Sequence, residues 1–253
     1  MSPRDFDPTT VPIKPAATVM LIRDVEPGTG TGVEVFMLRR TLNAVFGSGM
    51  YVFPGGRVET SDGLDVDRAH RLAAIRECYE EAGVLLAHDS TGATVVDGHD
   101  VLRERVGVND GSVDLEQLCS RHGLTLGLDD LVWVSHWVTP MGEARRFDTR
   151  FYQVPAPVGQ QSSHDDTETI DSLWTRPADA LVREEQGELM MMPPTIFILK
   201  LLSGFDSVDA AMAAVRTRPA PEVILPRLRG GADGQRRGVS IPGDDDYDSL
   251  PAD

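Results

Sequence analysis

The sequence predicts a mixed α/β fold, and three observations support it. Segments rich in Val, Ile, Phe, Tyr and Trp with strand-like patterning occur at residues 16–23, 33–39, 131–138, 146–154 and 170–175. A segment rich in good helix formers covers residues 67–82 and ends just before Gly83. Two further segments, 177–185 and 193–202, begin with proline and have helical composition. Periodicity alone says no more than mixed α and β.

The first third of the chain has the pattern of a hairpin, a turn and a helix. Residues 16–23 and 33–39 are joined by a Gly, Pro and Thr turn at 27–32, which predicts two paired strands. Residues 54–56 read Pro-Gly-Gly, and a glycine pair after proline indicates a tight turn where backbone carbonyls can approach a ligand. After the helix, residues 84–87 are expected to restart a strand.

The remaining segments predict additions to this pattern. Apolar positions at roughly helical spacing within 98–107 and 112–122 predict an inserted helical pair. A last helix is expected at 207–216. Residues 229–253 are polar and rich in Gly and Asp, so a disordered tail is expected there.

Charge and composition exclude several classes of partner. The formal net charge is −16, which opposes long-range attraction to nucleic acid or to an anionic membrane surface. No run approaches the ~18 apolar residues of a membrane span. Cys78 and Cys119 are expected to be buried thiols, not a disulfide. We therefore expect a cytoplasmic protein with no nucleic-acid or membrane partner, and an anionic ligand would need local positive charge.

Three glutamates are concentrated at the end of the predicted helix 67–82. At ~100° per residue, Glu77, Glu80 and Glu81 share one helix face. Like charges at this spacing repel, so a positively charged group is expected next to them. Mg²⁺ or Mn²⁺ suits an all-oxygen site of this kind. The alternative is a solvated acidic face on which Arg76 pairs with Glu80.

The helix and the glycines before it resemble the signature of the Nudix hydrolases. The matching residues are Gly56, Arg76, Glu77, Glu80, Glu81 and Gly83, with Cys78 and Val84 in the apolar slots. The loop between Gly56 and Arg76 is six residues longer than in the family pattern. Counted back from Arg76, the remaining glutamate of the pattern falls on Arg68. The acidic residues that could replace it are Glu59, Asp62, Asp65 and Asp67.

A wider stretch is similar to one branch of that family, the peroxisomal coenzyme A diphosphatases and their bacterial relatives. Residues 49–56, 74–86 and 137–152 carry this likeness. It implies a Nudix-type α/β/α sandwich with a mixed sheet. The domain boundaries expected from it are a flexible segment at 1–15, a Nudix domain at 16–202 with a helical insertion at about 98–122, a C-terminal helical extension at 203–228 and the tail at 229–253.

The resemblance also implies roles for individual residues. Glu77, Glu80 and Glu81 would ligate Mg²⁺ or Mn²⁺, with the carbonyl of Gly55 as a further ligand. Glu80 and Glu81 are thereby catalytic, and Arg76 would orient Glu77 or Glu80 instead of touching substrate. In such a site a metal-activated water attacks one phosphorus of a nucleoside diphosphate derivative.

The residues that complete the site are less closely specified. Glu168 is the candidate general base, with Asp165 and Asp166 as alternatives, and a solvated acidic loop is the competing interpretation. One arginine of each adjacent pair on a strand should point inward, where it would contact phosphates. These substrate-binding candidates are Arg39, Arg40, Arg145 and Arg146.

Three functions remain open at this point. The first is a diphosphohydrolase that acts on coenzyme A or an acyl-CoA. The second has the same chemistry with ADP-ribose, NADH or a nucleotide sugar. The third is a catalytically silent module that binds a nucleotide, against which the three retained glutamates argue. The residues do not determine the oligomeric state, and a homodimer is left open.

Overall fold

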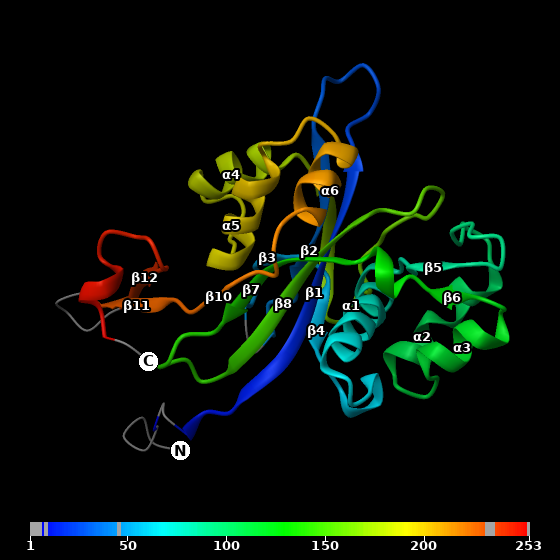
Figure 1. Ribbon diagram of the computed structural model, residues 1–253, viewed down its shortest axis with the longest axis horizontal. Coiled ribbons are helices and arrows are strands. Elements are labelled where there is room, and N and C mark those ends of the chain that lie inside the picture. Colours follow the sequence, from blue (N-terminus) through cyan, green and yellow to red (C-terminus); the bar gives the residue numbers. More distant parts are fainter. Residues whose placement is uncertain (1–6, 8–9, 45–46, 231–235, 252–253) are drawn as a thin grey trace.

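A mixed eight-stranded sheet separates two layers of helices (Figure 1). The computed structural model describes residues 7, 10–44, 47–230 and 236–251. The main strand order is β10-β7-β8-β1-β2-β3, with β4 paired to β1 and β9 paired to β2. The strands are β1 (Ile13–Asp24), β2 (Val33–Arg40), β3 (Tyr51–Val52), β4 (Gly55–Arg57), β7 (Val132–Val138), β8 (Arg146–Pro155), β9 (Thr169–Thr175) and β10 (Val223–Ile224). The mixed α/β/α sandwich is confirmed.

Alternation along β1 divides the interior into two cores. Ala17, Val19 and Leu21 point to one face of the sheet and join the core beneath helix α1 (Val66–Ala82). Met20 and Ile22 point to the other face and join the second core. Because successive side chains of a strand point to opposite faces, a strand that is apolar on both faces must lie between two layers.

Helix α1 begins and ends at the residues that its sequence indicates. The Asp65 side chain accepts a hydrogen bond from the backbone N–H of Arg68, which caps the first turn. Gly83 ends the helix in the left-handed conformation, with φ 69°. The helix covers Val66–Ala82, one residue longer at its start than the predicted range.

The second face of the sheet is covered by three helices from the C-terminal part of the chain (Figure 1). They are α4 (Pro177–Glu185), α5 (Pro193–Leu202) and α6 (Val208–Arg216). The two proline-led helices have the predicted bounds, since proline is well suited to the first turn. No helix among the described residues is long and apolar enough to span a membrane.

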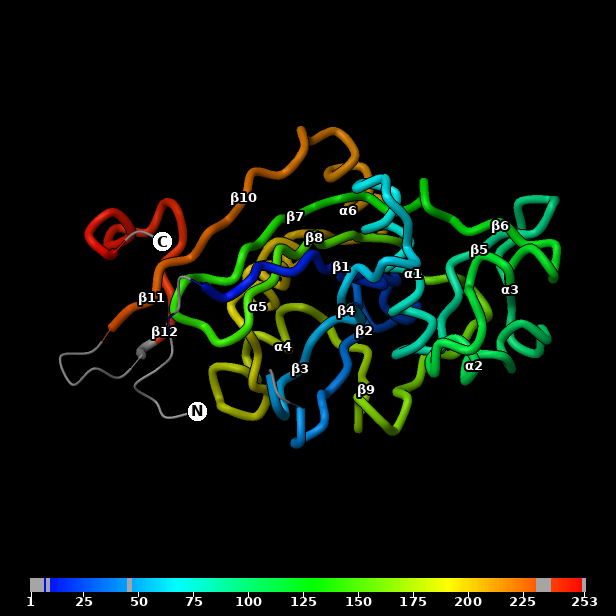
Figure 2. The backbone as a smooth tube through the Cα atoms, turned by 90° about the horizontal axis from the view of Figure 1, so that it is seen from below, coloured from blue at the N-terminus to red at the C-terminus, as the bar shows by residue number. Residues whose placement is uncertain are grey.

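The inserted segment packs against α1 at one end of the molecule (Figures 1 and 2). It contains η3 (Asp100–Glu104), α2 (Arg105–Asn109) and α3 (Leu115–Arg121). Leu115, Leu118 and Cys119 are buried in the α1 core, as the helical spacing predicts. The strand expected at 84–87 is nearly absent, because only Ala87–His88 pairs, with β6 (Thr125–Leu126).

Both ends of the chain differ from the sequence prediction. Residues 1–15 were expected to be flexible, yet Ile13–Pro15 form the start of β1 and pair with β8. The expected disordered tail holds a short hairpin of β11 (Arg227–Gly230) and β12 (Arg236–Ser240), followed by η5 (Tyr247–Ser249). Residues 1–6, 8–9, 231–235 and 252–253 lie outside the described part.

Ion pairs explain why the polar tail folds. The Arg229 guanidinium contacts both carboxylate oxygens of Asp246, at 2.7 and 2.8 Å, and lies 3.1 Å from Asp244. The buried hydroxyl of Ser240 donates to Asp246 at 2.7 Å. Composition favours disorder, but it does not reveal that specific Arg and Asp residues are brought together by a turn.

A buried hydroxyl joins α1 to the insertion and allows a stability test. The Tyr79 hydroxyl donates to the Val101 carbonyl at 2.5 Å in the core, so Tyr79→Phe leaves a buried carbonyl without its partner. We expect a loss of about 1–3 kcal/mol in the free energy of unfolding, measured by urea denaturation.

Tyr247→Phe removes the same kind of bond, to the Leu225 carbonyl, where water can replace it. It should cost no more than about 0.5 kcal/mol. Equal losses in the two variants would contradict the inference that the insertion and α1 share one core.

Candidate functional site

Two glycines allow the glutamates of α1 to reach the sheet. A Cβ atom on Gly56 would lie 2.4 Å from the Glu77 carboxylate, and one on Gly55 would lie 2.5 Å from the Thr18 hydroxyl. The backbone N–H of Gly55 donates to Glu81 at 2.9 Å. These glycines form strand β4 instead of the predicted tight turn. They are required because no side chain fits between β1 and the carboxylates.

Arg76 holds the acidic face of α1 together. Its Nη1 atom donates to Glu77 at 2.9 Å and to Glu80 at 3.0 Å. Its Nε and Nη2 atoms donate to the two oxygens of Asp62, each at 3.1 Å, and Nη2 also donates to the Arg57 carbonyl at 2.8 Å. The guanidinium therefore positions Glu77 and Glu80, in agreement with the orienting role that the resemblance implies.

Asp62 is the residue that the sequence comparison did not single out. It is 2% exposed and forms the paired contact with Arg76. Asp62 lies six residues after Gly56, the place of the pattern's glutamate when one counts forward from the glycine. Counting backward from Arg76 gave Arg68, which pairs on the surface with Glu116. The six extra residues thus lie between Asp62 and Arg76, and counting from both ends could have found Asp62.

Burial raises the pKa of all three glutamates. It raises the pKa of Glu80 to about 7 and outweighs the opposing effect of Arg76. Burial likewise raises the pKa of Glu77, although Arg76 lowers it. The pKa of Glu81 lies well above its usual range because of burial and because the Glu77 charge is close. Cations that approach this group would stabilise its charged forms.

The donor atoms suit a hard cation, although their arrangement does not outline a metal site. Among the described residues, no three His, Cys, Asp or Glu side chains converge as ligands of one ion. Arg76 pairs with Glu77 and Glu80, while Glu81 is turned toward Gly55 and Arg40. Carboxylate oxygens on one buried helix face are nevertheless the ligands that Mg²⁺ and Mn²⁺ prefer.

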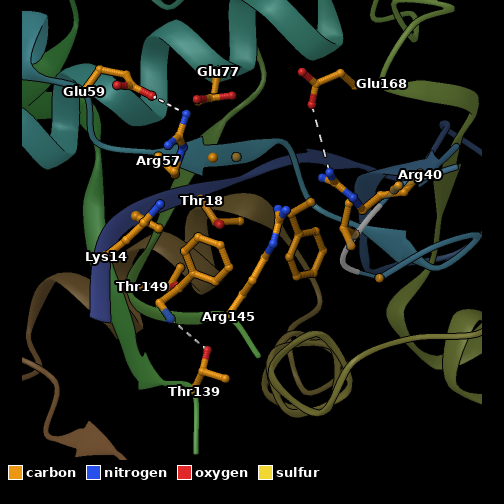
Figure 3. Close-up of a pocket in the computed structure, with 18 of the residues that line it drawn as sticks. Lys14, Thr18, Arg40, Arg57, Glu59, Glu77, Thr139, Arg145, Thr149 and Glu168 are labelled. Atoms are coloured by element: carbon orange, nitrogen blue, oxygen red, sulfur yellow. Dashed lines mark hydrogen bonds and ion pairs between the residues drawn. The ribbon is translucent and has the colours of Figure 1, made fainter. Parts of the chain in front are cut away.

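A cleft of about 1640 Å³ extends from Glu77 and Glu80 across β4 to the far face of the sheet (Figure 3). Its floor is made of alternate residues of β1 and β8, paired in register as Lys14 with Phe147, Ala16 with Thr149 and Thr18 with Phe151. Strand alternation puts these side chains on the face opposite α1. The glycines of β4 thus leave the glutamates open to a cleft on the other side of the sheet.

Six positive side chains line this cleft, together with nine carboxylates. The positive residues are Lys14, Arg40, Arg57, Arg76, Arg145 and Arg146, of which Figure 3 labels Lys14, Arg40, Arg57 and Arg145. Lys14 was missed because it falls in the segment expected to be flexible. Arg146 is buried and donates to the Thr139 carbonyl at 2.9 Å, so its side chain is partly engaged in structure.

The two arginines at the end of β2 point in different directions. Arg40 lies 3.9 Å from Glu81 and 4.0 Å from Glu168, and its buried Nε atom has no hydrogen-bond acceptor among the described residues. Arg39 does not line the cleft, because its Nε atom donates to the Gly49 carbonyl at 3.4 Å and its guanidinium lies over the Tyr51 ring. The expectation that one of the pair points inward thus favours Arg40.

The acidic loop before β9 brings one of its carboxylates to the cleft. Glu168 lines the cleft, and its side chain is 67% exposed (Figure 3). Asp165 lies outside the cleft lining and holds the loop, since its carboxylate accepts from Thr167 and Thr169. Although burial opposes it, these hydrogen bonds lower the pKa of Asp165 to about 2. Asp166 pairs with His164 at 3.0 Å, also outside the cleft lining.

Comparisons with known proteins agree with the resemblance to the Nudix hydrolases. The family model described as the NUDT19 Nudix domain matches residues 60–202. The Acyl-coenzyme A diphosphatase NUDT19 of Gallus gallus is 27% identical, over 86% of this chain and 74% of the relative. The protein of the same name from Homo sapiens is 28% identical, over 76% of this chain and 54% of the relative.

A solved structure agrees with the fold. The crystal structure of a NUDIX hydrolase from Alicyclobacillus acidocaldarius is similar with a TM-score of 0.73 and 30% identity. The likeness covers 83% of this chain and 100% of the other.

Removal of Asp62 tests whether it supports the site through Arg76. Asp62→Ala leaves a buried guanidinium with fewer partners, and we expect a loss of about 3 kcal/mol in the free energy of unfolding, measured by urea denaturation. The control is Asp67→Ala, in the first turn of α1, because the Asp67 side chain is 56% exposed. That loss should stay below about 1 kcal/mol. A smaller loss for Asp62 than for Asp67 would refute the supporting role.

Proposed function

The chain belongs to the Nudix hydrolase family, in the group of the NUDT19 Nudix domain, and is a diphosphohydrolase; from this premise we propose that it cleaves the diphosphate of coenzyme A or an acyl-CoA. A water molecule would attack one phosphorus of the diphosphate. The products would be phosphopantetheine, or its acyl thioester, and adenosine 3',5'-bisphosphate. The relatives named as acyl-coenzyme A diphosphatases support this choice of substrate.

The observation that carries the proposal is a cleft that brings several cations close to the buried Glu77 and Glu80 in an acidic protein. Lys14, Arg57 and Arg145 line it, and Arg40 lies beside Glu81. With a net charge of −16, the protein as a whole repels a polyanion. Coenzyme A carries a diphosphate and a separate phosphate, so a row of cations matches it better than a single cation would.

The proposal includes Mg²⁺ or Mn²⁺ held by Glu77, Glu80, Glu81 and the Gly55 carbonyl. Such an ion, when bound, supplies Lewis-acid polarisation of a phosphoryl oxygen and a water of lowered pKa. The protein holds these carboxylates in a buried position, which disfavours their negative charge. Arg76 and Asp62 keep Glu77 and Glu80 beside β4.

Other residues of the cleft would bind the substrate and accept the proton of the attacking water. The unpaired Nε atom of Arg40 offers a donor to a phosphoryl oxygen beside Glu81. Arg145 and Arg146 also line the cleft. The Glu168 carboxylate, exposed and near Arg40, would accept the proton of the attacking water. Arg39, which points away from the cleft, is left out of the proposed binding set.

ADP-ribose, NADH and nucleotide sugars contain the same bond and are the substrates to compare. They lack the phosphopantetheine arm, so product analysis separates them from coenzyme A. The cytoplasmic location and the homodimer stay predictions.

Product analysis of the intact protein tests the proposal. With Mg²⁺ or Mn²⁺ we expect chromatography to detect adenosine 3',5'-bisphosphate from coenzyme A, and Glu80→Gln to reduce its rate by about 100-fold or more. Glu185→Gln, on the exposed end of α4, removes the same charge outside the cleft and should retain full activity. Turnover of ADP-ribose or NADH but not coenzyme A would refute the substrate assignment.

The two lysines of the chain provide a matched test of the cleft. Lys14→Ala should lower kcat/KM for coenzyme A about 10-fold, because one cation is lost from the anion-binding wall. Lys200→Ala removes an exposed lysine of α5 that does not line the cleft, and it should change kcat/KM less than about 2-fold. The Lys14 effect should shrink as salt rises. Equal effects of the two variants would exclude Lys14 from binding.

A further inference from the structure

The cleft has an apolar end that the diphosphate chemistry does not use. Pro226 and Leu228, around the start of β11, and Val239, on β12, line it there, together with Val11 and Pro12 before β1. The residues on β11 and β12 lie beyond 60–202, the range that the family model matches. This end is therefore built by segments outside the range that the family model matches.

The strand register shows where this end lies relative to the glutamates. Strand β10 runs parallel to β7, pairing Ile224 with Trp137, so the chain leaves it beside the carboxyl end of β7. Strand β7 is antiparallel to β8, and β8 is parallel to β1, with Ile13 opposite Arg146. The C-terminal hairpin thus begins at the same end of the sheet as the amino end of β1, with β7 and β8 between them.

The length of the cleft between the two ends can be read from β1. Gly55, beside Glu81, pairs with Thr18, and β1 begins five residues earlier at Ile13. At about 3.3 Å per residue this stretch is about 17 Å long. An extended chain gains about 3.5 Å for every three backbone bonds, so a pantetheine arm of roughly a dozen bonds spans about 15 Å. A thiol linked to a diphosphate at the glutamates would arrive near the start of β1, and an acyl group on it would continue along that end of the sheet toward the hairpin.

We propose that the C-terminal hairpin forms the acyl-chain subsite of this enzyme, with Leu228 and Val239 against the acyl group of an acyl-CoA. The inference rests on the proposed function and adds where the acyl chain binds and how binding depends on the length of that chain. Pro226, Leu228 and Val239 are apolar, which suits a hydrocarbon chain better than an adenine ring, and Lys14 and Arg146 lie at the same end of β1 and β8. Arg40 and Arg76 lie beside the glutamates, where the diphosphate is expected.

Ion pairs connect the described part of the hairpin to the segment that follows it, and two isoleucines that flank the hairpin reach the core. Arg229 forms three contacts below 3.2 Å with Asp244 and Asp246, which follow β12. Ile224 and Ile241, just outside the hairpin, pack against the core beneath α4, α5 and α6. A fixed wall discriminates between chain lengths, because its shape does not adapt to the longer ligand.

The test is the acyl-chain profile of a variant that fills the subsite. Leu228→Trp should lower the ratio of kcat/KM for palmitoyl-CoA to that for free coenzyme A about 10-fold, and leave free coenzyme A within about 2-fold of the unaltered protein. Val223→Trp adds the same ring on β10, where the residue is 50% exposed and does not line the cleft, and should not change the ratio. Thermal unfolding of each variant verifies folding.

Further variants keep the result decisive if Leu228→Trp does not fold. Val239→Trp should lower the same ratio, and Leu228→Ala should shift the preferred acyl chain to a greater length. An unchanged acyl-chain profile would overturn the inference. So would an equal fall in kcat/KM for free coenzyme A and palmitoyl-CoA, because the hairpin would then contact a part that both substrates share. If the unaltered protein cleaves neither, the proposed function fails and the subsite with it.

Discussion

The site depends on one buried guanidinium. Arg76 is hydrogen-bonded to Asp62, Glu77 and Glu80, and these carboxylates raise its pKa although burial acts in the opposite direction. Without this positive charge, like charges would be buried on one helix turn at a considerable cost in free energy. The same contacts tie the loop after β4 to α1. A single side chain therefore sets the position of the acidic face relative to the sheet.

The second constraint is the absence of side chains on β4. The Gly55 backbone approaches Glu81, and Gly56 leaves room for Glu77, so a helix on one face of the sheet contributes to a cleft on the other. A Cβ at either position would push the helix and strand apart. The cleft then follows alternate residues of β1 and β8, and its lining includes carboxylates, cations and apolar side chains.

The sequence was most informative where residues close together in the chain determine the structure. Helix α1 has a capping Asp65 and a terminal Gly83, and α4 and α5 begin with proline, so their bounds follow from nearby residues. The acidic face of α1 followed from periodicity, and so did the expectation that one of Arg39 and Arg40 points inward, although not which one. Asp62 did not, because six extra residues shift the spacing on one side of it. Lys14 was missed because its strand pairs with a strand far along the chain, and the C-terminal hairpin was missed because composition does not reveal its strand pairing and ion pairs.

The central claim is that Arg76 and β4 hold the α1 glutamates ready for a divalent cation, and a crystal grown with Mn²⁺ tests it most directly. We predict an anomalous density peak beside Glu77 and Glu80, near the Gly55 carbonyl, which disappears in a Glu77→Gln crystal prepared in the same way. A peak at another place, or none while Arg76 still occupies the space between Glu77 and Glu80, would contradict the account.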